Sequence, residues 1–578
     1  MDFGAQNEEW AGTLIDALVE QGITYFCCAP GSRSTSLALS VAAHPKAYFS
    51  IHFDERAVGF HALGYAKASG RPAAVLTTSG TAVGNLLPAI MEACNDKIPL
   101  ILLTADRPPE LRDCGANQTC DQVKLFQNYV RWQVDLPCPD ARIPNRYLSG
   151  TIAQAVAMAT SSPPGPVHLN CMMREPLFSS HLPPSKKSTS HVAFAHPQLH
   201  PSKETLEYWV EALSPHKQGI ILAGSGTTGC LDAILALAER LQWPIFADIL
   251  SAPRTQANHP CLITHFDPIL KRKAASTQVG AIIQFGDRFV SKTLSLWLEQ
   301  QKPEFFLHVS EHTMRQDPSH LLTHRLHASP SLFTSGLLLS LGQREEDTWL
   351  TSFKRLDQAC KQALQEFFSS CQTLTEPGLI WEIASTLPES WALFFANSMP
   401  IRDANQFFSP QHTQCGPIFG NRGVSGIDGN IATLSGIAQG ADRPVLAVLG
   451  DLSLLHDLTS LSYLRKSAHP IILCVVNNGG GGIFSFLPIS QKKEVFEEFF
   501  ATAHNTSFAL AAKLFDLPYF HPKSSSELRD VLASARHSCL VEITTDRSEN
   551  VRIHEQILTH LEGCLQLVEL PGEIPILL

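Results

Sequence analysis

Two polar segments in the last third of the chain each follow an apolar run that reads as a buried strand. The run at 445–449 leads into Asp451, and the run at 471–476 leads into Asn478 and the glycines at 479–482. About one strand–helix–strand unit separates the two segments, so both are expected at the carboxyl ends of neighbouring parallel strands. Carboxylate and amide oxygens are hard ligands that suit Mg²⁺, and glycines let backbone N–H groups approach a diphosphate closely. Together the segments predict a metal–diphosphate pocket.

The glycine run also allows a simpler interpretation. Taken alone, NNGG at 477–480 would favour a glycine-rich hairpin beside an unrelated aspartate. A surface linker is not favoured, because polar residues would flank it and both flanks here are apolar. The pairing of Asp451 with Asn478 at this spacing instead favours the pocket.

Such a pocket needs parallel strands, and the chain has the alternation that builds them. Within the first 180 residues, strands are expected at 23–29, 48–53, 73–78 and 98–105, and helices at 54–71 and 79–96. Fully apolar strands alternating with helices imply a parallel sheet covered on both faces. Ligands of such sheets bind outside the carboxyl ends of the strands.

The alternation occurs in three blocks, which predicts an α/β fold of three Rossmann-like domains with parallel sheets. The expected domains are 1–180, 203–342 and 376–578. Residues 181–202 are rich in Pro, Ser, Lys and His without a periodic run, so they read as a linker. Residues 343–375 read as a polar, helical connector.

Composition excludes several classes of protein. The chain of 578 residues is 44% hydrophobic and has a net charge of −10 without a long basic block, which argues against nucleic acid as the main partner. No apolar run reaches the roughly 18 residues of a membrane span, and the polar, acidic start does not resemble a secretory signal. The 15 scattered cysteines lack a CxxC pair, so a reducing cytoplasm is expected rather than a disulfide framework or a zinc site.

A glycine fingerprint in the second block has two interpretations. GSGTTG at 224–229 follows the strand GIILA directly, as in dinucleotide-binding folds. The acidic residue expected about 20 positions further on is ambiguous, because Asp248 lies within a different strand. A tight strand-to-helix turn is the favoured interpretation, since a lone glycine fingerprint is weak evidence.

A set of motifs resembles one known family. The motifs are PGSRS at 30–34, LTTSGTAVGNLLPAI at 76–90, LTADRP at 103–108, GANQT at 115–119, NSMPIRD at 397–403, GNRGVSGIDG at 420–429 and NNGGGGIFSFLP at 477–488. Together they closely resemble the 2-succinyl-5-enolpyruvyl-6-hydroxy-3-cyclohexene-1-carboxylate synthases, thiamine-diphosphate enzymes of menaquinone synthesis. The resemblance is thin in the second block, where it depends on FGDRFVSKTL at 285–294. Leu452 replaces the third Gly of the general thiamine-diphosphate signature, a departure that is usual in this family.

The resemblance implies a pyrimidine-binding first domain, a central domain and a diphosphate-binding third domain. Glu55 would hydrogen-bond N1′ of the cofactor's aminopyrimidine and promote its reactive imino form, and Ile427 would hold the cofactor bent. Asp451, Asn478 and the carbonyl of Gly480 would hold Mg²⁺ or Mn²⁺. The implied cofactor-binding residues are Glu55, Ile427, Gly450, Asp451, Leu452, Ser453, Asn478, Gly480 and Ile483. Glu55 also has an alternative interpretation: an acidic residue is favoured in the first turn of any helix, whatever its function.

The family joins 2-oxoglutarate to isochorismate with loss of CO₂. Both substrates are dianions, and arginines bind carboxylates through bidentate forks. The resemblance assigns Ser398, Arg402 and Arg422 to 2-oxoglutarate. It assigns Ser32, Arg33, Arg107, Asn117, Gln118 and Lys292 to isochorismate. For any single arginine, a surface ion pair is the alternative.

The resemblance also implies an assembly. The first block carries Glu55 and the third carries Asp451 and Asn478, and in this family the two edges come from different subunits of a homodimer or a dimer of dimers. The rival interpretations are another thiamine-diphosphate 2-oxoacid decarboxylase or ligase, a non-catalytic binding subunit of the same fold, and an NAD- or FAD-dependent oxidoreductase that uses 224–229.

Overall fold

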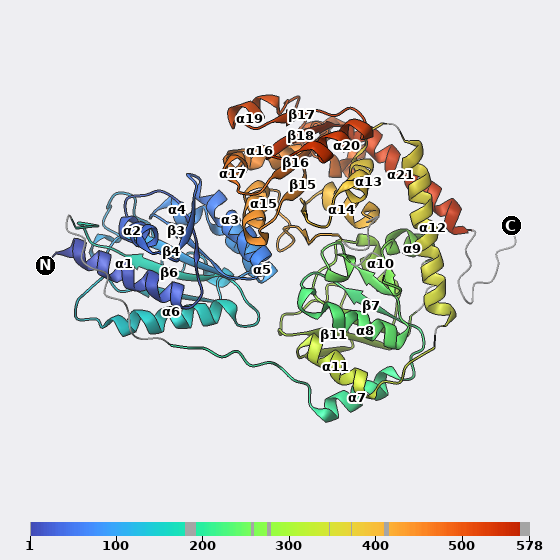
Figure 1. Ribbon diagram of the computed structural model, residues 1–578, viewed down its shortest axis with the longest axis horizontal. Coiled ribbons are helices and arrows are strands. Elements are labelled where there is room, and N and C mark those ends of the chain that lie inside the picture. Colours follow the sequence, from blue (N-terminus) through green and yellow to red (C-terminus); the bar gives the residue numbers. More distant parts are fainter. Residues whose placement is uncertain are drawn as a thin grey trace.

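The computed structural model describes residues 2–179, 192–255, 259–273, 279–345, 347–371, 373–409 and 415–566. The predicted linker at 181–202 therefore lies partly outside the described residues, as does the end of the third expected domain. Figure 1 shows three α/β units, and each contains a six-stranded sheet whose paired strands all run parallel. This confirms the predicted fold class. None of the described helices is both long and apolar enough to cross a membrane.

The first sheet has the strand order β2-β1-β3-β4-β6-β5. Its strands are β1 (Tyr25–Cys28), β2 (Tyr48–Ile51), β3 (Ala73–Thr77), β4 (Leu100–Asp106), β5 (Trp132–Leu136) and β6 (Val167–Met172). Its helices are α1 (Phe3–Glu20), α2 (Thr35–Ala43), α3 (Glu55–Ser69), α4 (Thr81–Gly84), α5 (Leu87–Asp96) and α6 (Asn145–Thr160). The inner strands β1, β3, β4 and β6 are buried along their whole length, whereas the edge strand β2 is largely exposed.

The predicted extent of one helix in this unit is wrong. The sequence predicts a single helix at 79–96, but the structure contains α4 and α5 with a break at Asn85 and Leu86. The physical reason is Pro88, which has no N–H to bond the carbonyl of Gly84 and whose ring crowds that carbonyl.

The second sheet has the strand order β12-β11-β10-β7-β8-β9. Its strands are β7 (Gly219–Ala223), β8 (Ile245–Ala247), β9 (Leu262–Ile263), β10 (Ala281–Phe285), β11 (Phe305–Ser310) and β12 (His324–His327). Its helices are α7 (Lys203–Leu213), α8 (Leu231–Leu241), α9 (Phe266–Lys273), α10 (Lys292–Gln300) and α11 (Pro330–Ser340), and the long helix α12 (Thr348–Ser370) follows. The glycine fingerprint forms the turn after β7, where Ser225 bonds the backbone of Asp287 and Arg288.

The third sheet has the strand order β14-β13-β15-β16-β18-β17. Its strands are β13 (Ala392–Phe395), β14 (Ile418–Phe419), β15 (Val445–Gly450), β16 (Ile471–Asn477), β17 (Tyr519–Phe520) and β18 (Cys539–Thr544). Its helices are α13 (Glu376–Thr386), α14 (Met399–Phe407), α15 (Asn430–Ala441), α16 (Asp451–His456), α17 (Leu461–Lys466), α18 (Lys493–Phe496), α19 (Ala509–Leu514), α20 (Ser525–Ser534) and α21 (Arg547–Gln566). Strands β15 and β16 pair from Val445 with Ile471 to Gly450 with Val476, so their carboxyl ends meet at one edge.

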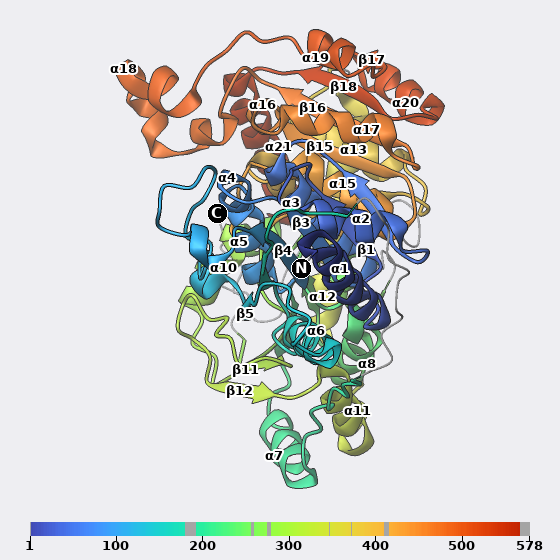
Figure 2. The same cartoon turned by 90° about the vertical axis from the view of Figure 1, so that its left-hand side faces the viewer.

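The first and third units pack directly on each other through α3 and α15, which lie side by side in Figures 1 and 2. Glycines allow this close approach, because a Cβ at Gly64 would overlap the carbonyl of Thr433 and one at Gly436 would overlap that of His61. Buried side chains of the second and third units also form one continuous core that includes α12 and α21. The three units therefore form one packed body.

Candidate active site

A cavity of about 280 Å³ lies at the carboxyl ends of β13, β15 and β16 in the third unit. It brings together residues from five separate segments of the sequence. The residues singled out from the sequence that line it are Ser398, Arg402, Arg422, Ile427, Gly450, Asp451, Leu452, Ser453, Asn478, Gly480 and Ile483. Their roles in catalysis stay predictions.

The carboxylate of Asp451 joins the ends of the two central strands. Asp451 is the first residue of α16, and its Oδ1 accepts the backbone N–H of Leu452 at 2.6 Å. Its Oδ2 accepts the backbone N–H of Gly480, beyond β16, at 2.9 Å, and His504 Nε2 lies 3.3 Å from the same oxygen. Burial raises the pKa of Asp451, while the two backbone hydrogen bonds act in the opposite direction.

The amide of Asn478 is held at one end only. Its Nδ2 donates to Oε1 of Glu376 at 3.0 Å, whereas its Oδ1 is buried and accepts no hydrogen bond from any residue that the structure describes. A buried, unpaired oxygen is unfavourable unless a donor or a cation meets it. Burial, with Asp403 nearby, raises the pKa of Glu376 to about 7.

The glycine run gives the backbone the shape that this edge needs. Gly479 and Gly480 have φ angles of +73° and +145°, which side chains with a Cβ rarely adopt. A Cβ at Gly480 would also overlap the carbonyl oxygen of Ala501. This explains why glycines, rather than other small residues, follow the buried strand β16.

These donors fit a hard divalent cation. Among the described residues no group of three His, Cys, Asp or Glu side chains could hold a metal, but that set excludes amide and backbone oxygens. Asp451 offers a carboxylate, Asn478 offers an unpaired amide oxygen, and Gly480 offers a carbonyl. Such an oxygen set, with few protein ligands, is typical of Mg²⁺ that also binds phosphate.

Two half-buried arginines face the same cavity. Arg402 Nη1 donates to the carbonyl of Ser398, which has a φ of +75°, and Arg422 Nη1 donates to Oδ1 of Asn397 at 2.7 Å. Burial lowers the pKa of both guanidinium groups, and the charge of Arg422 lowers that of Arg402 further. Within the described ranges neither arginine pairs with a carboxylate, so both charges are available to an anionic ligand.

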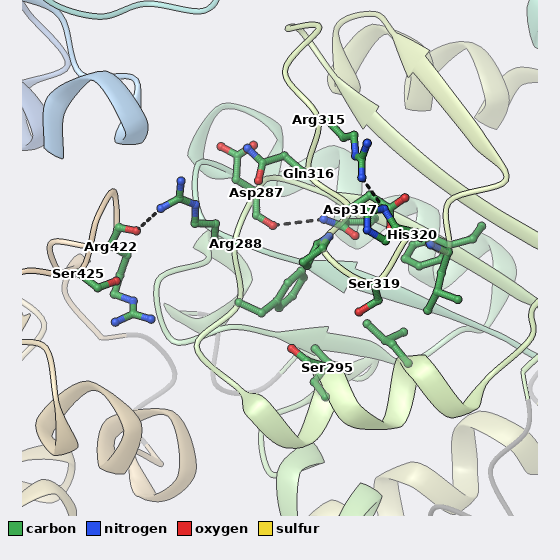
Figure 3. A pocket seen from close by; sticks show the side chains of 17 residues that line it. Asp287, Arg288, Ser295, Arg315, Gln316, Asp317, Ser319, His320, Arg422 and Ser425 are labelled. Carbon is green, nitrogen blue, oxygen red and sulfur yellow. Dashed lines mark hydrogen bonds between the residues drawn. The ribbon is translucent and has the colours of Figure 1, made fainter. Parts of the chain in front are cut away.

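The loop that carries Arg422 is held by all three units. Glu92 of the first unit accepts the backbone N–H groups of Gly423 and Val424, each at 2.7 Å. Arg288 of the second unit donates to the carbonyl of Arg422 at 2.7 Å. Figure 3 shows this contact at the rim of a second cavity of about 530 Å³, which Arg422 and Ser425 also line. Arg422 therefore lies between the two cavities.

A second group of predicted residues gathers at the carboxyl edge of the first sheet. Arg107 donates to Oγ of Ser79 and, at 2.8 Å, to the carbonyl of Gln118, whose Nε2 donates to the Ser79 carbonyl at 3.0 Å. Burial, and then the positive charge of Arg33, lowers the pKa of Arg107. Ser32 and Asn117 are exposed beside them.

Arg33 and Lys292 stand in different surroundings. Arg33 is buried and donates to Oε1 of Glu175 at 2.6 Å and to the carbonyl of Met173 at 3.1 Å. Lys292 is exposed at the first position of α10, directly after the capping Ser291. Neither residue lines the two cavities described above.

Glu55 is also separate from the cavity that Asp451 lines. It is half-buried at the start of α3, and its neighbour Asp54 accepts a hydrogen bond from Thr459 Oγ1 at 3.0 Å. Arg56 donates to the carbonyl of His456 at 2.9 Å. The start of α3 thus docks on the end of α16 and on the residues after it, whereas Asp451 lies at the beginning of α16.

Three residues of the site escaped the sequence analysis as functional positions. Glu376 follows a capping threonine and resembles an ordinary acidic helix start, and His504 lies in a loop without a motif. Asn397 lies inside a recognised motif, yet only the structure shows that it binds Arg422 and the carbonyls of Asn421 and Gly426. No local sequence signal marks the first two.

Comparison with known proteins gives the class. Three family models match: "Thiamine pyrophosphate enzyme, N-terminal TPP binding domain" at residues 9–125, "Middle domain of thiamine pyrophosphate" at 185–395 and "Thiamine pyrophosphate enzyme, C-terminal TPP binding domain" at 401–543. The fold is similar to that in the crystal structure of benzoylformate decarboxylase from Polynucleobacter necessarius, with a TM-score of 0.74 and 15% identity over 93% of this chain and 98% of that chain. The protein is an enzyme of the thiamine-diphosphate (thiamine pyrophosphate) class.

Sequence relatives define the family within this class. The chain is 39% identical to the 2-succinyl-5-enolpyruvyl-6-hydroxy-3-cyclohexene-1-carboxylate synthases of Rubrobacter xylanophilus and Salinibacter ruber, over 96% of this chain and 99% and 97% of theirs. It is 38% identical to the enzyme of that name from Chloroflexus aurantiacus, over 95% of each chain. The chain therefore belongs to the 2-succinyl-5-enolpyruvyl-6-hydroxy-3-cyclohexene-1-carboxylate synthase family, which confirms the resemblance.

Proposed function

We propose that the protein decarboxylates 2-oxoglutarate and adds the resulting four-carbon unit to isochorismate. The product is 2-succinyl-5-enolpyruvyl-6-hydroxy-3-cyclohexene-1-carboxylate, an intermediate of menaquinone biosynthesis. The observation that carries this proposal is the pair of half-buried arginines, Arg402 and Arg422, in the cavity that also contains Asp451 and Asn478. A dianionic 2-oxoacid needs such cations beside the cofactor, and a pyruvate-like substrate with one carboxylate does not.

We assign the metal–diphosphate end of the cofactor to the edge formed by β15 and β16. Asp451, the free Oδ1 of Asn478 and the carbonyl of Gly480 would hold Mg²⁺ or Mn²⁺, and the neighbouring Gly450, Leu452, Ser453 and Ile483 would contact the cofactor. Thiamine diphosphate, when bound, supplies the carbanion chemistry at its thiazolium ring. The chain's own residues fix its position and neutralise its charge.

We assign Ile427 to the shape of the bound cofactor. Its carbonyl accepts hydrogen bonds from Asn430 Nδ2 at 2.9 Å and from Ser453 Oγ at 2.7 Å. These bonds fix the backbone at Ile427, and its side chain borders the cavity. A rigidly held, bulky side chain there would force the cofactor into a bent shape.

We assign the donor and acceptor substrates to different residues. Arg402, Arg422 and Ser398 would bind 2-oxoglutarate, because they line the cavity with the proposed metal ligands. Ser32, Arg33, Arg107, Asn117 and Gln118 would bind isochorismate, together with Lys292. Arg33 follows β1 and Arg107 follows β4, so both cations stand at the carboxyl edge of the first sheet, which supports a site for a dianion there.

We propose that the active enzyme is a homodimer or a dimer of dimers. Strand β2 exposes Tyr48, Phe49 and Ile51, and Phe53 follows, with exposed fractions between 49% and 69% directly before Glu55. Strands of parallel α/β sheets are ordinarily buried, and an exposed apolar patch often marks a contact with another protein. The exposed apolar residues of β2 therefore favour burial of this strand against a second copy of the chain. In that arrangement Glu55 of one subunit would complete the cavity of the other, where it would hydrogen-bond the cofactor's pyrimidine.

The domain assignment and the compartment are part of the same proposal. Residues 1–180 would be the pyrimidine-binding domain, 203–342 the central domain and 376–578 the diphosphate- and metal-binding domain, with 181–202 and 343–375 as connections. A cytoplasmic location is supported by the cysteines, since all 15 are described and none forms a disulfide.

The test is a product assay. The protein is mixed with thiamine diphosphate, Mg²⁺ and 2-oxoglutarate, with and without isochorismate, and the products are identified by mass. We expect the joined product, with sustained release of CO₂, only when both substrates are present. Pyruvate in place of 2-oxoglutarate serves as the control, and equal turnover with pyruvate would contradict the proposed role of the two arginines.

A further inference from the structure

The hydrogen bond between Asn478 and Glu376 decides which way the amide of Asn478 points. The two ends of a side-chain amide have nearly the same shape, so their partners determine its orientation. Oε1 of Glu376 lies 3.0 Å from Nδ2 of Asn478. This Oε1 accepts the hydrogen bond, so it holds the NH₂ end of the amide and leaves the oxygen end free. That free Oδ1 is the buried, unpaired atom at this edge of the sheet.

Glu376 is itself held firmly. It is only 4% exposed, and it occupies the first turn of α13, where the helix dipole favours a negative charge. Thr545 Oγ1 donates to its Oε1 at 2.9 Å, in addition to the bond from Asn478. The capping bond from the backbone N–H of Gly378 to Thr375 fixes the start of the helix. The carboxylate is therefore a rigid acceptor rather than a mobile side chain.

We propose that Glu376 is a positioning residue of the metal site, which turns the Asn478 amide so that its oxygen meets the cation. This inference rests on the proposed function, in which Asp451 and Asn478 hold a divalent metal. A glutamine at 376 offers both a donor and an acceptor, so it would allow the amide of Asn478 to turn its NH₂ group toward the cation. Partners behind a metal ligand ordinarily contribute about 10- to 100-fold to metal affinity.

The first experiment measures metal binding rather than turnover. Mn²⁺ is titrated into the full-length protein with thiamine diphosphate present, and free Mn²⁺ is followed by electron paramagnetic resonance. Glu376→Gln should weaken Mn²⁺ binding about 10- to 100-fold. The matched control is Glu382→Gln, which changes a second buried carboxylate of α13 that pairs with Arg529. The control should bind Mn²⁺ as wild type does, and wild-type affinity in Glu376→Gln would overturn the proposal.

A second experiment separates orientation from charge. An aspartate at 478 has an oxygen at both ends, so its orientation no longer matters, and a glutamine at 376 donates to it. In the Asn478→Asp background, Glu376→Gln should therefore cost no Mn²⁺ affinity. An equal loss in both backgrounds would show that Glu376 acts only through its charge or its packing, and would overturn the positioning role.

Two further variants distinguish failure of the metal site from failure of the role proposed for Glu376. Asp451→Ala tests the metal site itself: if it binds Mn²⁺ as wild type does, the proposed function and this inference both fail. If Asp451→Ala loses Mn²⁺ and Glu376→Gln does not, only the inference fails. Should Glu376→Gln not fold, Thr545→Val removes a donor to the same carboxylate and should weaken Mn²⁺ binding about fivefold, the equivalent of one hydrogen bond. Wild-type affinity in Thr545→Val would then contradict the inference.

Discussion

Oδ2 of Asp451 accepts the backbone N–H of Gly480 at 2.9 Å, which ties the end of β15 to the glycine turn after β16. The bond fixes the carboxylate beside the unpaired Oδ1 of Asn478, because Asn478 precedes the same turn. Each carboxylate oxygen accepts one backbone N–H, from Leu452 and from Gly480, and keeps a further lone pair that a cation could use.

Asp451→Ala should weaken cofactor binding far more than it weakens the fold. The carboxylate is assigned as a metal ligand, and the metal carries the diphosphate. Isothermal calorimetry with thiamine diphosphate should show a large loss of affinity when Mg²⁺ is present, while the thermal midpoint without cofactor changes little. Unchanged affinity in the presence of Mg²⁺ would reject the assignment.

Glu55→Gln should remove most activity and leave folding nearly intact. Glutamine keeps the size of the side chain and its hydrogen-bonding atoms, but it lacks the charge that would support the reactive form of the cofactor. Steady-state turnover and the thermal midpoint are measured on the same preparation. Turnover close to that of wild type would mean that Glu55 only starts helix α3.

Arg402→Ala and Arg33→Ala should impair different half-reactions. Loss of Arg402 should slow decarboxylation of 2-oxoglutarate itself, since Arg402 lines the cavity of Asp451 and Asn478. Loss of Arg33, at the edge of the first sheet, should spare that step and slow transfer to isochorismate. Each lost charge-assisted bond is worth about 1.5–3 kcal/mol, or about tenfold to a hundredfold in the affected step.

Single-turnover assays with and without isochorismate separate the two steps. Arg33 also pairs with the exposed Glu175, so Glu175→Gln is the control for loss of that ion pair alone. If both arginine variants impair both steps equally, the division of basic residues between two substrates is wrong.

Inactive Glu55→Gln and Asp451→Ala proteins should complement each other when their subunits exchange. If Glu55 serves the cavity of the other subunit, a mixed dimer has one site with both lesions and one with neither. Random pairing makes half of the dimers mixed, so activity should recover to about a quarter of wild type. Subunit exchange is checked by mass. Exchange without recovery would place both residues in one site of one chain.

Gly436→Ala should destabilise the contact between the first and third units. A Cβ at Gly436 would overlap the carbonyl of His61 on α3, and overpacking of this kind costs about 1–3 kcal/mol. The control is Gly12→Ala on α1, where a Cβ meets no atom within 4 Å and should stabilise the helix by about 0.5–1 kcal/mol. Denaturant unfolding measures both changes, and equal effects of the same sign would contradict the packing argument.

The sequence determined the features that depend on local pattern. Apolar strands alternating with helices predicted three parallel α/β units, because period and run length reflect how each element is buried. Polar residues directly after the strands at 445–449 and 471–476 predicted that Asp451 and Asn478 share one edge, and both line one cavity. Apolar periodicity alone predicts one helix at 79–96, but Pro88 cannot bond the carbonyl of Gly84, so the structure contains α4 and α5 instead.

Only the tertiary structure decided which distant groups contact Asp451 and Asn478. Glu376 and His504 meet Asn478 and Asp451 from separate elements, and neither carries a motif. The structure also decided that Glu55 is apart from this cavity within one chain and lies beside an exposed apolar strand. Sequence spacing constrains only neighbours along the chain and adjacent strands. The packing of whole sheets against one another determines which remote side chains meet, and that packing depends on every buried contact at once.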